Sequence, residues 1–194
     1  MGLFDRIAEK FKSHDPAEHR AEEDAPFRSA WTGGELVLAP SSHTAEECFY
    51  GDGEYRISFR VNDSFKPAKS HAGEVEMPHT YAPYDEYGVE GAYPYLAVQC
   101  DDAVYGAVEA YKEGGTVPGA LELTPMSGTF YFRAKIEYYG SLMYFYGMDL
   151  CGGTLENQGL CMVYPKELAG TETERRLMSV LDEVAESYRE ERKA

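Results

Sequence analysis

The strongest constraint on the fold is an alternating run of side chains over residues 130–139. Every second position is apolar or aromatic, and these positions are Phe130, Phe132, Ala134, Ile136 and Tyr138. Alternation of period two over this length predicts a β-strand that packs one face against a core. Gly140 and Ser141 then predict a turn, and residues 142–146, apolar on both faces, predict an antiparallel partner. The second half of the chain is therefore expected to contain a central hairpin.

Other apolar patterns predict further strands around this hairpin. Residues 55–61 alternate cleanly after the turn signal at residues 51–53, which is typical of a half-buried strand. The remaining predicted strands lie at residues 35–39, 95–100 and 159–164, with a weaker one at residues 74–77.

Two segments change to the helical period. The apolar stripe of the first consists of Ala103, Val104, Ala107, Val108 and Tyr111. It predicts a helix near residues 102–113. Thr171 with Glu174 fits a capping box that opens a C-terminal helix near residues 172–190. Helices on such a sheet predict an α+β fold, a layered α/β sandwich with a mostly antiparallel sheet.

A set of stretches carries a resemblance to a known fold. They are YRISFRV (55–61), PYLAVQCDD (94–102), FYFRAKIEYY (130–139), LMYFYGMDL (142–150), GLCMVYP (159–165) and TETERRLMSVLDEVAESY (171–188). In this order they resemble the Mog1/PsbP-like α/β sandwich over about residues 54–188. Proteins of this fold are mostly binding or assembly modules, and the resemblance implies no catalytic residue that could be carried over to this chain.

The N-terminal region is expected to stand apart from the sandwich. Residues 1–12 have apolar side chains at helical spacing and predict a short amphipathic helix. Such a helix needs a surface to dock on, which could be its own domain, a second copy or another protein. The charged face carries both signs, which favours protein over membrane. Residues 13–26 are polar and charged, typical of a linker, and a single domain is expected over 27–194.

The formal net charge of −16, from 18 basic and 34 acidic side chains, argues against nucleic acid and anionic membranes as partners. A basic protein, a cation or a neutral ligand remains compatible with it. The chain shows no secretory pattern and no run of about 20 apolar residues, so a cytoplasmic location is expected. Cys48, Cys100, Cys151 and Cys161 form no CxxC pair. They suit a reducing compartment, although Cys151 and Cys161 could meet across a turn.

The most unusual segment is HTYAPYDEYGVEGAYPY, residues 79–95, which is expected to form a long loop. Its tyrosines offer contact area at low entropic cost, and its acids favour a positive partner. The candidate contact residues are Tyr81, Tyr84, Asp85, Glu86, Tyr87, Glu90 and Tyr93. Alternatively, the loop folds back over the sheet and its rings cover apolar surface.

No catalytic or metal motif stands out. His71, Glu74, Glu76 and His79 match no zinc pattern, and no GxSxG elbow or P-loop is present. We therefore expect no catalytic residue, no metal site and no cofactor. The sequence favours a non-enzymatic binding or assembly module that contacts a protein partner or associates with itself through the N-terminal helix. The alternative is a small-ligand-binding protein or enzyme whose site lies on the aromatic face of strands 131–139 and 142–146.

Overall fold

The computed structural model describes residues 37–51, 53–69, 76–83, 94–98 and 102–193. The predicted N-terminal helix (1–12) and linker (13–26) lie outside these residues. The strands are β1 (Ser42–Gly51), β2 (Gly53–Asn62), β3 (Lys66–Lys69), β4 (Glu76–Ala82), β5 (Tyr95–Val98), β6 (Ala120–Pro125), β7 (Phe132–Tyr138), β8 (Ser141–Leu150), β9 (Leu155–Pro165) and β10 (Arg189–Arg192). The helices are α3 (Asp102–Gly114) and α4 (Glu172–Ser187), with 3-10 turns η1 (Cys151–Gly153) and η2 (Lys166–Leu168).

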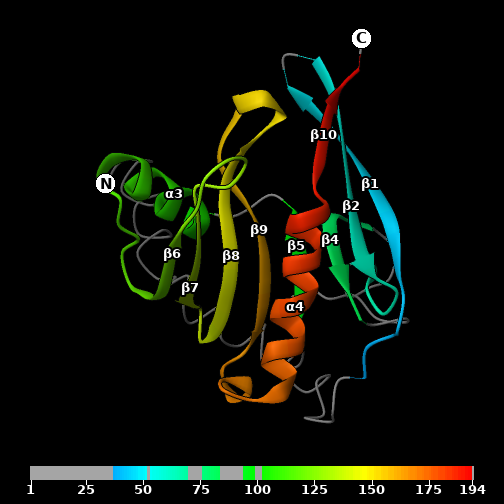
Figure 1. The fold of residues 1–194 in the computed structure, drawn as a ribbon, viewed down its shortest axis with the longest axis vertical. Coiled ribbons are helices and arrows are strands. Elements are labelled where there is room, and N and C mark those ends of the chain that lie inside the picture. The colour runs from blue at the N-terminus through cyan, green and yellow to red at the C-terminus, as the bar shows by residue number, and fades with distance from the viewer. Residues whose placement is uncertain (1–36, 52, 70–75, 84–93, 99–101, 194) are drawn as a thin grey trace, which may run out of the picture.

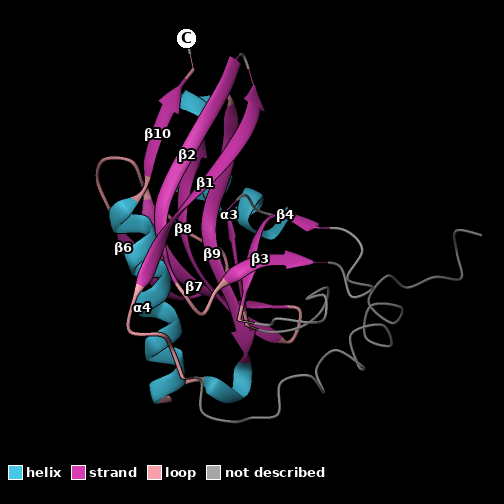
Figure 2. Cartoon of the chain, turned by 90° about the vertical axis from the view of Figure 1, so that its right-hand side faces the viewer, coloured by secondary structure: helices cyan, strands magenta, loops and turns pink. Residues whose placement is uncertain are grey.

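The strands form two sheets, and all the strand pairs described are antiparallel (Figure 1). The seven-stranded sheet has the order β3-β4-β5-β9-β8-β7-β6, and the three-stranded sheet has the order β1-β2-β10. Figure 2 shows the long strands β1 and β2 crossing in front of the larger sheet. The expected α+β architecture, a layered sandwich with a helix near 102–113 and a C-terminal helix, is confirmed.

The central hairpin is confirmed as β7 and β8, paired from Phe132 with Gly147 to Tyr138 with Ser141. Its turn consists of Tyr139 and Gly140, one residue earlier than the sequence suggested. Both have positive φ, 42° and 81°, which matches the right-handed twist of the strands that the turn joins. The two-faced apolar pattern of β8 is explained by its place between β9 and β7, because both faces of the sheet are covered there.

Two apolar cores lie on opposite faces of the larger sheet. On one face, α3 packs against a core that contains Phe132, Phe145 and Cys161. On the other face, α4 and the smaller sheet cover a larger core that includes Phe59, Tyr144 and Leu181. Alternate residues of the same strands supply the two cores, as the period of a β-strand requires. The result is a layered molecule in which α3 and α4 lie on opposite sides of β8 and β9 (Figure 1).

The capping box of α4 is confirmed in a modified form. The Thr171 hydroxyl accepts a hydrogen bond from the Glu174 backbone N–H at 3.2 Å, as a capping residue does. The Glu174 carboxylate reaches back to the N–H of Gly170 at 2.6 Å. It also accepts a hydrogen bond from the buried Tyr164 hydroxyl at 2.8 Å. The first turn of α4 is therefore fixed to β9 as well as to its own backbone.

Several boundaries differ from those expected. The C-terminal helix ends at Ser187 rather than at residue 190, since Tyr188 has an extended backbone (φ −56°, ψ 130°) and β10 follows. The described part of the predicted strand at residues 35–39 is not strand, and β1 begins at Ser42. The predicted loop from residue 79 begins later, because β4 continues to Ala82. Strands β3, β6 and β10 are rich in polar or exposed residues. The sequence did not predict them, because the prediction of strands relied on alternating apolar residues.

The two cysteines that could have met across a turn do not pair. Cys151 and Cys161 are both buried and free, and they belong to the cores on opposite faces of the larger sheet. Cys48 is free and exposed. In the part of the chain that the structure describes, no helix is long and apolar enough to cross a membrane.

Candidate functional site

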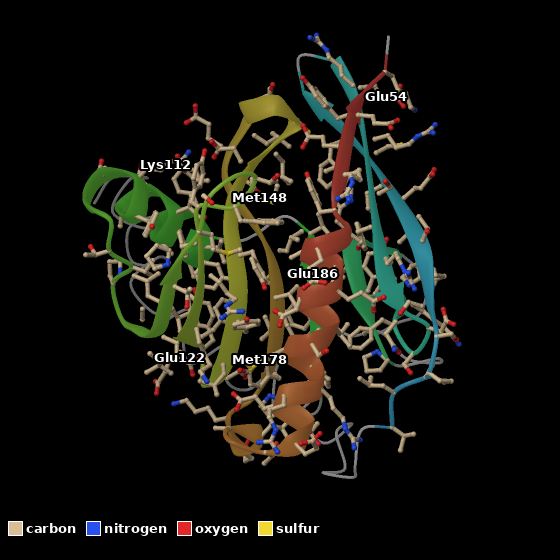
Figure 3. The ribbon with its side chains drawn as sticks, in the orientation of Figure 1. Glu54, Lys112, Glu122, Met148, Met178 and Glu186 are labelled. Carbon is tan, nitrogen blue, oxygen red and sulfur yellow. The ribbon has the colours of Figure 1, made fainter. Side chains whose placement is uncertain are left out.

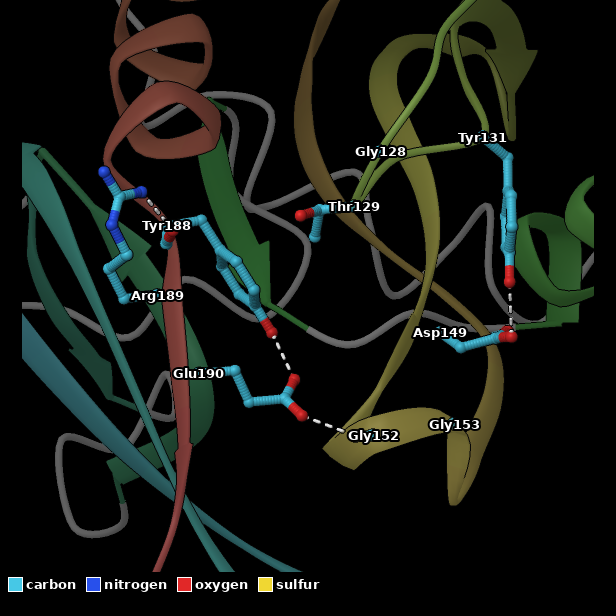
Figure 4. A pocket seen from close by; sticks show the side chains of 9 residues that line it. All are labelled: Gly128, Thr129, Tyr131, Asp149, Gly152, Gly153, Tyr188, Arg189 and Glu190. Atoms are coloured by element: carbon cyan, nitrogen blue, oxygen red, sulfur yellow. Dashed lines mark hydrogen bonds between the residues drawn. The ribbon is translucent and has the colours of Figure 1, made fainter.

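A pocket of about 600 Å³ opens where α4 passes into β10, next to the ends of β7 and β8. It is lined by Gly128, Thr129, Tyr131, Asp149, Gly152, Gly153, Tyr188, Arg189 and Glu190. Figure 4 shows two tyrosine–carboxylate pairs on opposite sides of this space, with Thr129 between them. We call this space the seam pocket, because β10 belongs to the smaller sheet while Asp149 belongs to the larger one. A volume of this size suits a small organic ligand.

The first pair is Tyr131 and Asp149, on the side of the larger sheet. The Tyr131 hydroxyl donates to Asp149 Oδ2 at 2.7 Å. Lys112 of α3 donates to both carboxylate oxygens, at 2.7 and 2.9 Å, and the N–H of Asn157 donates to Oδ1 at 2.8 Å. Asp149 therefore links α3, β9 and Tyr131, the residue before β7, at this end of the sheet. Figure 3 shows Lys112 on α3.

The second pair is Tyr188 and Glu190, on the side of β10. The Tyr188 hydroxyl donates to Glu190 Oε2 at 2.8 Å. The same oxygen accepts the N–H of Cys151 at 3.0 Å, and Glu190 Oε1 accepts the N–H of Gly152. Successive N–H groups that converge on one carboxylate form a small anion-binding nest. In this protein the nest in η1 is filled by the chain's own Glu190.

The local sequence explains why η1 can form this nest. Cys151, Gly152 and Gly153 all have positive φ, at 57°, 61° and 91°. Glycine adopts this region without steric cost, whereas a side chain such as that of Cys151 makes it unfavourable. A Cβ on Gly152 would lie 3.2 Å from the Tyr55 hydroxyl. The CGG sequence therefore permits a tight connection from β8 to β9 against the smaller sheet.

Burial and hydrogen bonding keep both phenols protonated. The hydrogen bond to Asp149, with burial, raises the pKa of Tyr131 to about 12. Burial, with the hydrogen bond to Glu190, raises the pKa of Tyr188 well above its usual range. Burial would raise the pKa of Asp149, but the hydrogen bonds from Lys112, Tyr131 and Asn157 outweigh it and hold that pKa below its ordinary value. Asp149 is thus an ionised acceptor rather than a proton donor.

The sequence-predicted contact residues lie elsewhere or outside the described chain. Tyr81 lies in β4 and is only 3% exposed. Its hydroxyl donates to Glu47 of β1, and its ring meets Phe59 edge-on at 5.6 Å. It contributes to the core as part of a strand, not of a loop. Tyr84, Asp85, Glu86, Tyr87, Glu90 and Tyr93 lie outside the described residues, so their role stays a prediction.

His79 shares the same carboxylate as Tyr81. Its Nδ1 lies 2.8 Å from Glu47 Oε2, and its ring stacks on Phe49 with 3.9 Å between centroids. Burial would raise the pKa of Glu47, but the bonds from His79 and Tyr81 hold it below its ordinary value. Because Glu47 belongs to the smaller sheet and His79 to the larger one, this cluster is a second link between the sheets.

The aromatic sheet face that the sequence offered as an alternative site is closed. Tyr144 and Tyr146 are buried, and both donate to Asp182 of α4, at 3.1 and 2.7 Å. The Arg133 guanidinium lies over the Tyr144 ring at 5.6 Å. The middle of this face is therefore filled by α4, and the seam pocket begins only beyond it, at Tyr131.

Sequence reasoning missed the seam pocket because its residues come from four separate segments, at 128–131, 149, 152–153 and 188–190. The one local signal is the pair Gly152-Gly153, which by itself indicates only a turn. Among the residues that the structure describes, no three His, Cys, Asp or Glu side chains gather as a metal site would need.

Comparison with protein-family models, with curated proteins and with solved structures returns no match to this chain. The resemblance to the Mog1/PsbP-like fold therefore stays a prediction.

Proposed function

We propose that this protein is a small-molecule-binding protein whose binding site is the seam pocket. The observation that carries the proposal is an open pocket of about 600 Å³, in which Tyr131, Asp149, Tyr188 and Glu190 are held in place by their own hydrogen bonds. Binding sites of small ligands are pre-formed hollows with a few fixed polar groups. The sequence left a small-ligand-binding protein open as an alternative, with its site on the aromatic face of strands 131–139 and 142–146. The site proposed is instead the seam pocket, at the end of these strands and beside β10.

The network favours binding over catalysis. Acid–base catalysis needs a group whose pKa lies near the working pH. The pKa of Asp149 is held below its ordinary value, and the pKa values of Tyr131 and Tyr188 are raised above theirs. These three groups therefore keep one protonation state around neutral pH, which suits recognition.

A fragment screen by ligand-observed NMR tests the proposal when it compares the wild type with a plugged variant. Thr129→Trp fills the space between the two tyrosine–carboxylate pairs (Figure 4), while Thr44→Trp places the same ring at an exposed position on β1, with β2 between it and β10. We expect fragments that bind the wild type and the Thr44 variant but not the Thr129 variant. Identical hits on all three proteins, or no hits on any, would contradict the proposal.

A protein partner is the second candidate, and one feature of the larger sheet favours it. Strand β6 ends this sheet, and two large apolar side chains are exposed on or beside it, Leu121 at 54% and Met126 at 41%. Edge strands accept extended peptides as additional strands. Cross-linking in lysate with the wild type and with Leu121→Lys/Met126→Lys separates this candidate from the first, since only a β6 partner would be lost.

A further inference from the structure

We infer that the ligand of the seam pocket is a small organic cation with N–H donors, such as an amine or a guanidinium compound. This inference rests on the proposed function and adds the chemical class of the ligand. It follows from the direction of the hydrogen bonds in the pocket and from the balance of charge around it.

The direction of the phenol hydrogen bonds makes both tyrosines acceptors toward the pocket. A tyrosine hydroxyl has one proton to donate and lone pairs that accept. The proton of Tyr131 is committed to Asp149, and that of Tyr188 is committed to Glu190. Because both phenols remain protonated at neutral pH, only their lone pairs are left for a ligand. Any hydrogen bond between a ligand and these two phenols must therefore use a donor of the ligand.

The charges of the two carboxylates are balanced differently. Asp149 is matched by the ammonium of Lys112, and its two oxygens receive four hydrogen bonds in all. Glu190 accepts only neutral donors among the described residues, namely two backbone N–H groups and the Tyr188 hydroxyl. The pocket thus contains one carboxylate charge that no described side chain neutralises by an ion pair. A cation in the pocket would supply that missing charge.

Arg189, the one basic side chain in the lining, does not occupy this role. Its Nη1 donates to the backbone oxygens of Glu186 and Tyr188, at 3.3 and 2.6 Å. In Figure 4 its side chain runs along the end of α4, on the far side of Tyr188 from Thr129. The positive charge of Arg189 is therefore directed at the helix end, where carbonyl groups favour a cation.

The net charge of the chain adds to the preference for a cation. The whole chain, with a net charge of −16, attracts cations and repels anions at long range. Charge and the direction of the phenol hydrogen bonds thus point to the same class of ligand.

Three four-carbon probes separate charge from shape. 1,4-Diaminobutane, 1,4-butanediol and succinate have the same chain length, and their binding to the full-length protein is measured by NMR titration at physiological ionic strength. We expect the diamine to bind at least about tenfold more tightly than the diol, a difference of about 1.4 kcal/mol. Succinate is expected not to bind. Comparable or tighter binding of the diol or of succinate would overturn the inference but leave the proposed function standing.

Matched variants exclude a general attraction of cations to an acidic protein. Glu190→Gln removes the carboxylate charge in the pocket, and Glu191→Gln removes one exposed charge at the next position of β10. We expect the diamine affinity to fall at least about tenfold in the first variant and to stay near the wild-type value in the second. An equal effect in both variants would show diffuse attraction and overturn the inference.

A third variant covers the case in which loss of Glu190 disturbs the fold. Tyr131→Phe keeps the ring and removes the acceptor oxygen, so diamine binding is expected to weaken while the melting temperature changes little. Unchanged diamine binding in this variant would also overturn the inference. If none of the three probes binds, and no fragment from the screen binds the wild type but not Thr129→Trp, the proposed function fails as well.

Discussion

The hydroxyl of Tyr188 donates a 2.8 Å hydrogen bond to the carboxylate of Glu190, two residues along the chain, where α4 ends and β10 begins. The same carboxylate accepts the N–H groups of Cys151 and Gly152 in η1. Since β10 pairs with β2 in the smaller sheet and η1 joins β8 to β9 in the larger one, Glu190 connects the two sheets. The seam pocket therefore lies beside a structural joint.

Replacing Glu190 by Ala is expected to lower the free energy of unfolding by about 1–3 kcal/mol, because two backbone N–H groups and a buried phenol lose their acceptor. Urea denaturation measures this loss, and amide hydrogen exchange should speed up at Cys151 and Gly152. Glu191→Ala is the control, since Glu191 is exposed on the same strand. Equal stability of the two variants would show that the hydrogen bonds to Glu190 contribute nothing to the free energy of unfolding.

The residue after strand β10, Lys193, also binds the smaller sheet, at Glu54. The N–H of Lys193 donates to the backbone oxygen of Glu54 at 2.9 Å, and the two side chains form an ion pair. Figure 3 shows Glu54 beside the end of this strand. The strand sequence REER has no apolar residue, so it carries no alternating pattern of a strand. This explains why the sequence prediction extended the C-terminal helix to residue 190.

The sequence predicted the parts of the fold whose signals are local. Alternation over 130–139 predicted the central hairpin, and Thr171 with Glu174 predicted the start of α4. In both cases the residues that carry the signal also make the contact. The hairpin turn was placed one residue late, because positive φ at Tyr139 depends on the twist of the paired strands rather than on the tyrosine.

The seam pocket could not be predicted in the same way. Tyr131 and Asp149 are 18 residues apart in sequence, and they face Glu190 across the pocket only because α4 and β10 pack beside the larger sheet. Tyr81 shows the same limit. The composition of residues 79–95 predicted a long loop with Tyr81 as a contact residue, but Tyr81 lies in β4 and its ring is in the core, 3% exposed. Long-range packing decides both outcomes, and a single sequence does not encode it as a local pattern.

Gly147 in β8 is expected to be intolerant of a side chain. A Cβ there would lie 2.6 Å from two ring carbons of Phe132, which is fully buried. Gly147→Ala should therefore lower the free energy of unfolding by about 1–3 kcal/mol through overpacking. Gly106→Ala is the matched control, since no atom lies within 4 Å of its Cβ position in α3. In a helix this change should stabilise by about 0.5–1 kcal/mol, so a destabilised Gly106 variant would contradict the packing argument.

The three described cysteines should react with iodoacetamide at very different rates. Cys48 is exposed, whereas Cys151 and Cys161 are buried. Burial and the nearby Glu190 raise the pKa of Cys151 to about 11, which leaves on the order of one molecule in a thousand as thiolate at about pH 8. Peptide mass spectrometry should show early labelling of Cys48 and late labelling of Cys151 and Cys161. Early labelling of Cys151 would mean that η1 opens readily.

The stability that Asp149 supplies should depend on pH in the acid range. Its folded pKa is held below its ordinary value: burial opposes ionisation, but the hydrogen bonds from Lys112, Tyr131 and Asn157 outweigh it. A carboxyl of this kind contributes its full stabilisation above the unfolded pKa of about 3.9 and loses it as the pH falls through the folded pKa. Asp149→Asn should therefore be less stable than the wild type at neutral pH, and the difference should shrink below about pH 4.

Urea denaturation between neutral and strongly acidic pH measures this difference. Lys112→Met serves as the second variant, because loss of the ammonium removes a large part of what lowers the pKa of Asp149. The acid transition of Lys112→Met should then begin at a higher pH than that of the wild type. Asp149→Asn should show no loss of stability from protonation at position 149. If the wild type and Asp149→Asn lose stability in parallel at every pH, the charge of Asp149 does not stabilise the fold, and Tyr131 and Lys112 are held in place by packing alone.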